Sequence, residues 1–223
     1  MDRWRYRGAA PILRGSIVFA RSTTIRVQPS SIDAGISFVP DEVIPTVQAV
    51  DGCIGVSLLV NRQSGRCIFT TAWQTEDALR AGLALVQPMR SRSEELFGGN
   101  RTSEQWEIAN LHRDHRASES ACVRVTWVQV DPSRIDGGIQ MYKESALPEI
   151  EDLEGFCSAS LMVNRATGQA VSSVTFDSRD AMERNRANAT ALKNATMSGA
   201  GATELGEGEF DLALAHLRAP EMI

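Results

Sequence analysis

The sequence predicts an α+β fold made of two tandem ferredoxin-like units, each with the element order βαββαβ. The stretch from Pro29 to Asp77 is repeated from Pro132 to Asp180 at a constant displacement. In each copy a helical pattern separates a first strand from a hairpin, and a second helical pattern precedes a last strand. A repeat of this length indicates two units of about a hundred residues, each large enough to bury a core.

Each copy begins with a strand and a helix. In the first copy, residues 25–28 are rich in β-branched side chains and end at Pro29, which is typical of a strand. The spacing Ser30-x-x-Asp33 then predicts a capped helix start, and we expect this helix to reach about Val50. Gly52 is expected to end this helix. The second copy has the same features in the same order: a strand at 123–130 that ends before Pro132, a helix start at Ser133 and Asp136, a helix end near Leu153, and Gly155.

Prolines lie inside both predicted helices. Pro45 and Pro148 lack a backbone N–H, and each ring clashes with the carbonyl four residues earlier. We therefore expect a kink in each helix. Pro40 is expected to break the first helix, since it adds a second interruption there.

A hairpin follows in each copy. Residues 53–62 and 156–165 form apolar runs typical of strands buried on both faces. An Asn-Arg pair and a Ser/Thr-Gly pair then predict a tight turn. The partner strands are expected at residues 66–73 and 169–176.

The rest of each copy is predicted as a helix, a glycine-rich loop and a last strand. The helices are expected from Asp77 to about Met89 and from Asp180 to about Met197, the loops at 98–101 and 199–208, and the strands at 106–112 and 210–217. This divides the chain into a flexible extension at 1–20, a first repeat at 21–113, a linker at 114–120 and a second repeat at 121–218.

Composition limits the possible partners and the compartment. The 223 residues carry a net charge of −5, which argues against general nucleic-acid binding. No apolar run is long enough to span a membrane. The four cysteines show no C-x-x-C spacing, which favours free thiols in a reducing, cytoplasmic compartment over disulfides or a zinc site.

The two repeats are expected to cover each other. With both helices on one face of each sheet, the second face is left bare, although the hairpin residues on it are also apolar. Packing the two sheets against each other would bury these faces and give an internal pseudo-dimer. Pairing of two such pseudo-dimers into a further homodimer is left open by the sequence.

Three motifs carry a resemblance to a known family: the helix with a late proline at 146–156, the run S-L-M-V-N-R-A-T-G-Q-A, and T-A-W-Q-T-E-D-A-L in the first copy. The sequence resembles the dimeric α/β-barrel proteins, which include antibiotic-biosynthesis monooxygenase domains and stress-responsive barrel proteins. The resemblance covers both repeats. It implies an intramolecular dimeric α/β barrel that holds a ligand between sheet and helices.

The resemblance also implies candidate ligand-binding residues. A tryptophan at the end of the third strand is often part of the site in this family, and Trp73 matches that position, with Phe176 as its counterpart. Haem-degrading members share an asparagine on the first strand and a histidine on the second helix. Here the first-strand positions hold Thr24 and Trp127, and neither second helix contains a histidine. Trp127 is therefore kept only as a ligand-binding candidate, and no cofactor is expected.

Other polar motifs have structural explanations. Turn chemistry explains Asn61-Arg62 and Asn164-Arg165 better than an anion site does. Helix capping accounts for Asp33 and Asp136 better than a general-base role. The histidines have no clustered thiol or carboxylate nearby in sequence, so no metal site is expected, and the catalytic residues are unknown. The glycines of 199–208 match no phosphate-binding motif.

Two functions follow from these observations. The first is a small-molecule-binding or stress-related barrel without catalysis. The second is a cofactor-independent monooxygenase-like enzyme acting on a small hydrophobic aromatic substrate, with Trp73 lining its pocket. Polar groups converging beside Trp73 would favour the enzyme, and purely apolar neighbours would favour the first function.

Overall fold

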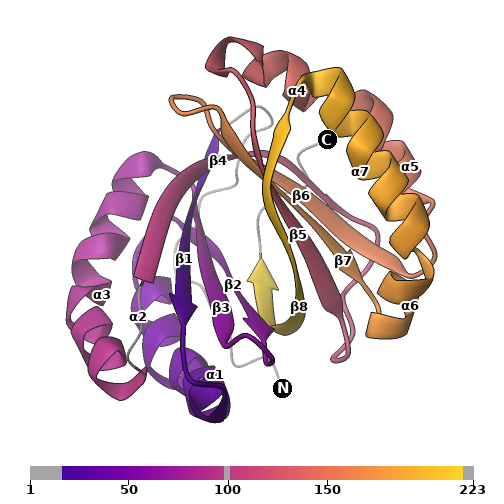
Figure 1. Cartoon of the computed structure of the whole chain (residues 1–223). Helices are drawn as coiled ribbons and strands as arrows, with labels where there is room; N and C mark the ends of the chain where they lie inside the picture. The colour runs from indigo at the N-terminus through magenta and orange to yellow at the C-terminus, as the bar shows by residue number, and fades with distance from the viewer. Residues whose placement is uncertain (1–16, 98–100, 218–223) are drawn as a thin grey trace. The chain divides into compact units, whose positions relative to one another are not determined.

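The computed structural model describes residues 17–97 and 101–217, and it divides into two compact units (Figure 1). The first contains residues up to Gln105 together with 213–217, and the second contains Trp106 to Leu212. The unit boundaries fall inside the two last strands, β4 (Arg101–Arg113) and β8 (Thr203–Leu217). Each of these strands therefore contributes residues to both units, whereas the sequence placed each within one repeat.

The first unit has an antiparallel sheet with the order β1-β3-β2. Its elements are β1 (Val18–Arg26), η1 (Pro29–Ser31), α1 (Ile32–Phe38), η2 (Val39–Val43), α2 (Ile44–Gln48), β2 (Cys53–Asn61), β3 (Arg66–Trp73) and α3 (Glu76–Phe97). In Figure 1 its helices, indigo to magenta, lie along one face of this sheet. Buried Ile44, Val47 and Leu79 from these helices pack with Val56 and Trp73 of the strands.

The second unit repeats this plan, with the strand order β8-β5-β7-β6-β4. Its elements are β5 (Cys122–Gln129), η3 (Pro132–Arg134), α4 (Ile135–Met141), η4 (Tyr142–Ala146), α5 (Leu147–Glu151), β6 (Phe156–Asn164), β7 (Gln169–Phe176), α6 (Arg179–Arg184) and α7 (Arg186–Ala200). The core contains Tyr142, Leu147 and Ile150 from the helical side and Leu161 and Val163 from β6.

Several predicted boundaries were wrong. β1 begins at Val18, inside the stretch expected to be an extension, while residues 1–16 lie outside the described part of the chain. The loop expected at 199–208 is mostly strand β8. Its Gly208 is needed for space rather than for a turn, because a Cβ there would lie 2.8 Å from Cε2 of Phe210. The loop expected at 98–101 falls largely outside the described residues.

The first helix of each copy keeps its helical conformation through the prolines. Pro40 lies within η2, which is a π-helical turn, so the predicted break is wrong. Pro45 follows at the start of α2, and Pro148 occupies the same place in α5. A proline has no N–H to donate, and the wider π-turn accommodates the missing bond. Gly52 and Gly155 have φ of 86° and 70° after these helices, as the sequence predicts.

The predicted capping by Asp33 and Asp136 was also wrong. Neither side chain caps its helix. Asp33 accepts a hydrogen bond from Nη1 of Arg62 at 2.7 Å, and Asp136 pairs with Arg165 in the same way. These arginines lie at the hairpin turns, where the turn chemistry predicted for the adjacent asparagines is confirmed: Oδ1 of Asn61 accepts from the N–H of Ser64 at 2.8 Å.

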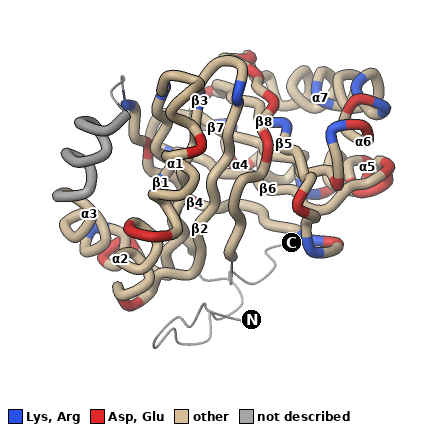
Figure 2. The backbone as a smooth tube through the Cα atoms, turned by 90° about the horizontal axis from the view of Figure 1, so that it is seen from below, with Lys and Arg blue, Asp and Glu red and all other residues tan. Residues whose placement is uncertain are grey.

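The charged side chains of the second unit are interspersed. Figure 2 shows acidic and basic segments close together on α5 to α7, where Arg184 pairs with Glu154 and Arg186 pairs with Glu183. Among the helices in the described part of the chain, none is long and apolar enough to cross a membrane.

Candidate functional site

Each unit contains an apolar cavity between its sheet and its helices. Cavity 1, in the first unit, has a volume of about 150 Å³, and cavity 2, in the second, about 130 Å³. Most lining positions correspond through the repeat, so that Ile32, Leu58 and Val60 of cavity 1 become Ile135, Leu161 and Val163 of cavity 2. The repeat has therefore kept a cavity at the same place in both units.

Trp73 lies at the end of β3 and lines cavity 1. Its side chain is buried, and Nε1 donates a hydrogen bond to Oγ1 of Thr71 at 2.9 Å. The ring lies against Gly82 of α3, where an added Cβ would be 2.3 Å from Cη2 of the indole. The tryptophan is thus both a core residue and part of the cavity wall.

Phe176 takes the corresponding place in cavity 2 and is fully buried. Asn185 replaces the glycine that faces the ring in the first unit. Its side-chain amide donates to the backbone oxygens of Glu154 and Ala181, each at 2.8 Å. Asn185 also separates α6 from α7, whereas α3 is continuous.

Cavity 2 has buried polar groups that sequence reasoning missed. Tyr142 of η4 is buried, and Ser172 of β7 donates a hydrogen bond to its phenol oxygen at 3.4 Å. Burial raises the pKa of Tyr142 to about 12, so the phenol keeps its proton at neutral pH. Arg124 of β5 also lines the cavity, and its Nη2 donates to Oε1 of Glu209 at 3.0 Å.

A signal for Arg124 was present in the sequence. Arg21 and Arg124 occupy the same repeat position on the first strand of each copy. An arginine retained twice at such a position indicates a paired or ligand-facing cation, because an unpaired buried charge is costly. Arg21 lines cavity 1, as Arg124 lines cavity 2.

The structure places Trp127 elsewhere. It is not among the described residues that line the two cavities. Its ring packs edge-to-face against Phe210, with ring centroids 6.4 Å apart. Of the three ligand-binding candidates, Trp73 and Phe176 are therefore the two that line cavities.

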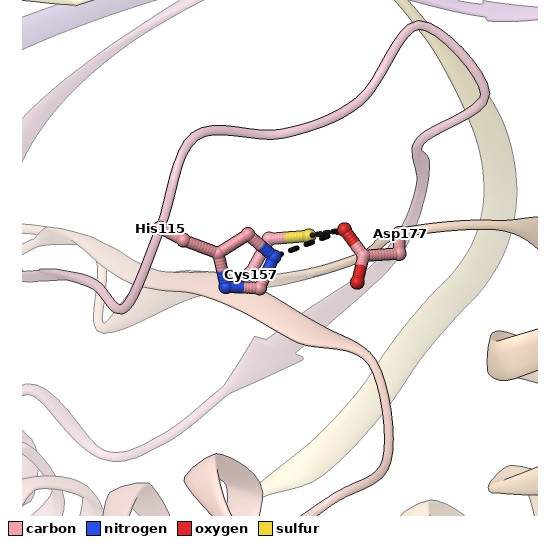
Figure 3. Close-up of side chains that lie close together, drawn as sticks. All are labelled: His115, Cys157 and Asp177. Atoms are coloured by element: carbon pink, nitrogen blue, oxygen red, sulfur yellow. Dashed lines mark hydrogen bonds and ion pairs between the residues drawn. The ribbon is translucent and has the colours of Figure 1, made fainter.

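A second polar cluster joins His115, Cys157 and Asp177 (Figure 3). Nδ1 of His115 lies 2.8 Å from Oδ2 of Asp114, and Nε2 lies 3.0 Å from Oδ1 of Asp177. Cys157 donates to the same Asp177 oxygen at 3.1 Å. Sequence reasoning missed the cluster because His115 and Asp177 are 62 residues apart.

The electrostatics of this cluster favour a charged imidazole. Ionised carboxylates only accept hydrogen bonds, so both ring nitrogens of His115 must donate. The hydrogen bonds with Asp114 and Asp177 raise the pKa of His115, and the bond from His115 lowers the pKa of Asp177. Burial and the adjacent Asp177 raise the pKa of Cys157 to about 12, which keeps it a thiol.

The spacing of the three groups would also suit a metal ion, since their ligand atoms lie within 4.8 Å of one another. Their mutual hydrogen bonds already give each group a partner. Ser118 adds a bond of 2.7 Å to the backbone oxygen of Asp177. We therefore interpret the cluster as a clamp that fixes the segment between β4 and β5 to the end of β7.

Two relatives from Mycobacterium tuberculosis strain H37Rv match nearly the whole chain. The uncharacterized protein Rv2557 is 58% identical over 218 residues, which cover 97% of each chain. The uncharacterized protein Rv2558 is 54% identical over 211 residues, which cover 94% of this chain and 89% of its own. This chain belongs to their family. No protein-family model matches it.

Solved structures resemble this Rv2557-family chain in fold. A Fusobacterium nucleatum protein provisionally assigned as a monooxygenase has a TM-score of 0.71 and 11% identity, covering 92% of this chain and 96% of its own. An anthrone oxidase-like protein has a TM-score of 0.66 and 12% identity, covering 96% and 98%. The fold class of two tandem ferredoxin-like units and the resemblance in fold to antibiotic-biosynthesis monooxygenase-like proteins are confirmed.

Proposed function

We propose that the protein binds a small, predominantly apolar molecule in the cavity of each unit. The observation that supports this function is the retention of both cavities at corresponding repeat positions. An apolar cavity of roughly 150 Å³ can hold a benzene ring. The expected ligand is therefore about the size of a single ring.

The cost of such cavities supports a binding role. Protein interiors are close-packed, and residual cavities destabilise a fold by about 24 cal/mol per Å³. An empty cavity of this size would cost roughly 3 kcal/mol by that measure. Two repeats whose lining side chains have diverged would be expected to close such spaces unless a ligand occupies them.

Calorimetric titration with fluorobenzene tests this proposal. The wild-type protein is expected to bind about two molecules per chain. Val43→Phe should fill cavity 1 and Ala146→Leu should fill cavity 2, because these are corresponding lining positions. Each filled variant is expected to lose one site. Leu85→Phe is the control, since Leu85 is 53% exposed. Unchanged binding in both filled variants would contradict the proposal.

The composition of cavity 1 favours a second candidate, a cofactor-independent oxygenase acting on a small aromatic substrate. Its wall combines Trp73 with the polar side chains of Arg21, Thr23 and Thr71. An aromatic ring could stack on the indole while the polar groups orient its oxygen substituents.

Oxygen uptake tests this candidate. Hydroquinone, which is of single-ring size, should be consumed with oxygen by the wild-type protein, and the rate should fall at least tenfold in Trp73→Phe. Phe176→Leu serves as the matched change in the second unit. Uptake that is absent, or equal in wild type and Trp73→Phe, would exclude catalysis at this site.

A further inference from the structure

We propose that cavity 2 selects an uncharged molecule with a carbonyl-type oxygen, which Arg124 recognises. The inference rests on the proposed function, because it specifies the ligand chemistry at one of the two cavities. It concerns the second unit alone.

Two nitrogen atoms of the Arg124 guanidinium group have no hydrogen-bond acceptor in the described part of the chain. The residue is 7% exposed and lines cavity 2, and only its Nη2 reaches Glu209. Within the described part of the chain, its buried Nε and Nη1 have no hydrogen-bond partner. A guanidinium group can only donate, and a buried donor without a partner is costly. An oxygen on the ligand would supply the acceptor that the protein lacks.

The charge balance favours a neutral oxygen over a carboxylate. Glu209 already faces Arg124, and it also accepts from Arg186 at 2.8 Å. Arg186 in turn pairs with Glu183 at 2.6 Å. The positive charge of Arg124 is therefore already compensated by a carboxylate. A carboxylate would bring an uncompensated negative charge into an apolar cavity, whereas a carbonyl brings an acceptor without that desolvation cost.

Tyr142 supplies a second donor in the same cavity. Because Ser172 donates to its phenol oxygen, the phenol proton is available to a ligand. The ammonium of Lys193, which also lines the cavity, is held by Glu204 and Glu207 at 2.7 Å each. Cavity 1 has Val39 and Phe69 at the positions of Tyr142 and Ser172, so this phenol donor belongs to cavity 2 alone.

A pair of planar ligands of nearly equal shape tests the inference. 4′-Fluoroacetophenone carries a carbonyl where 4-fluoro-α-methylstyrene carries a methylene group, and 4-fluorobenzoate supplies the anionic alternative. Fluorine NMR titration of the full chain separates the two cavities, because Val43→Phe and Ala146→Leu each remove one bound resonance and so assign it.

The ketone is expected to bind cavity 2 about tenfold more tightly than the alkene, the factor that one hydrogen bond from a charged donor of about 1.5 kcal/mol gives. Arg124→Met should abolish this preference at cavity 2. Glu209 keeps Arg186 as its partner in that variant. Tyr142→Phe should reduce the preference several-fold. Arg21→Met is the matched change in cavity 1 and should leave the cavity 2 preference intact.

The outcomes separate the inference from the proposed function. Equal binding of ketone and alkene in cavity 2 would overturn the inference while leaving ligand binding established. Tighter binding of the benzoate than of the ketone would overturn it in favour of an anion site. If no bound resonance disappears in Ala146→Leu, no ligand occupies cavity 2, and both the inference and the proposed binding in this cavity would be overturned. If Arg124→Met does not fold, the ligand pair and Tyr142→Phe decide the question.

Discussion

The two units place aromatic rings differently around equivalent cavities. In the first unit the large ring of Trp73 lies against Gly82. The second unit has the smaller Phe176 at the repeat position of Trp73 and the larger Asn185 at that of Gly82. A second exchange moves a ring from strand to helix: Phe69 of β3 lines cavity 1, and Tyr142 of η4 lines cavity 2. The repeat has therefore changed which element supplies an aromatic ring to the cavity wall.

Polarity, in contrast, has not been conserved. The ring exchange brings the phenol of Tyr142 and the hydroxyl of Ser172 into cavity 2, at positions where cavity 1 has Val39 and Phe69. A shared fold and a shared cavity can therefore serve two different ligands, since function depends on the groups in the site rather than on the fold.

The largest effect is expected from Tyr142→Val. This variant has valine at position 142, as the first unit has at Val39, but it lacks the ring that Phe69 supplies in the first unit. Removing this buried side chain should lower the free energy of unfolding by about 2–4 kcal/mol. Adding Ser172→Phe should restore at least half of the loss, because it supplies a ring at the position of Phe69. Urea denaturation of the singles and the double variant measures the coupling. If the loss of stability in the double variant equals the sum of the losses in the two single variants, the two positions do not compensate each other and the proposed ring exchange is contradicted.

A smaller effect is expected from Gly82→Asn. A Cβ at this position would lie 2.3 Å from Cη2 and 2.6 Å from Cζ2 of Trp73. Overpacking of this kind should cost about 1–3 kcal/mol. Trp73→Phe should relieve most of it, since Phe176 and Asn185 coexist in the second unit. Urea denaturation measures both variants. If the double variant Gly82→Asn/Trp73→Phe is no more stable than Gly82→Asn alone, the destabilisation does not come from a clash with the indole.

The smallest effect concerns the clamp, in which His115 bonds to Asp114 and Asp177. The first unit has Gln74 at the repeat position of Asp177. The pKa of His115 is raised, so its stabilising contribution is full below its ordinary pKa and is lost as pH rises through the folded value. The pKa of Asp177 is lowered, so its contribution is lost only in acid.

His115→Gln should therefore lower stability at about pH 6 by less than about 1 kcal/mol, as is typical of exposed ion pairs. At about pH 9 the effect should nearly vanish. Unfolding curves at both pH values give the comparison. If His115→Gln lowers the free energy of unfolding more at about pH 9 than at about pH 6, the clamp does not depend on a charged His115.

Local sequence patterns predicted the repeat, the hairpins and the glycines after the first helices, because turn chemistry and helix ends depend on neighbouring residues. The length of β8 could not be predicted in this way. Gly206 and Gly208 resemble loop residues, yet Gly208 lies on a strand where the ring of Phe210 needs space. Asp33 resembled a cap because its true partner, Arg62, is 29 residues away.

Trp73 and Phe176 could be selected because family resemblance pointed to one strand end. The polar groups of cavity 2 could not, since their roles depend on long-range pairing. Arg124 meets Glu209 across 85 residues, and Ser172 reaches Tyr142 across 30. The first pair follows from the pairing of β5 with β8, and the second from the packing of η4 on β7.

The central claim is that each unit holds its own cavity for a single-ring ligand. Anomalous diffraction from crystals soaked in bromobenzene tests it most directly. We predict one bromine peak bounded by Trp73 in the first unit and one bounded by Phe176 in the second. Bromine found only on the outer surface, with both cavities filled by protein side chains, would contradict the account.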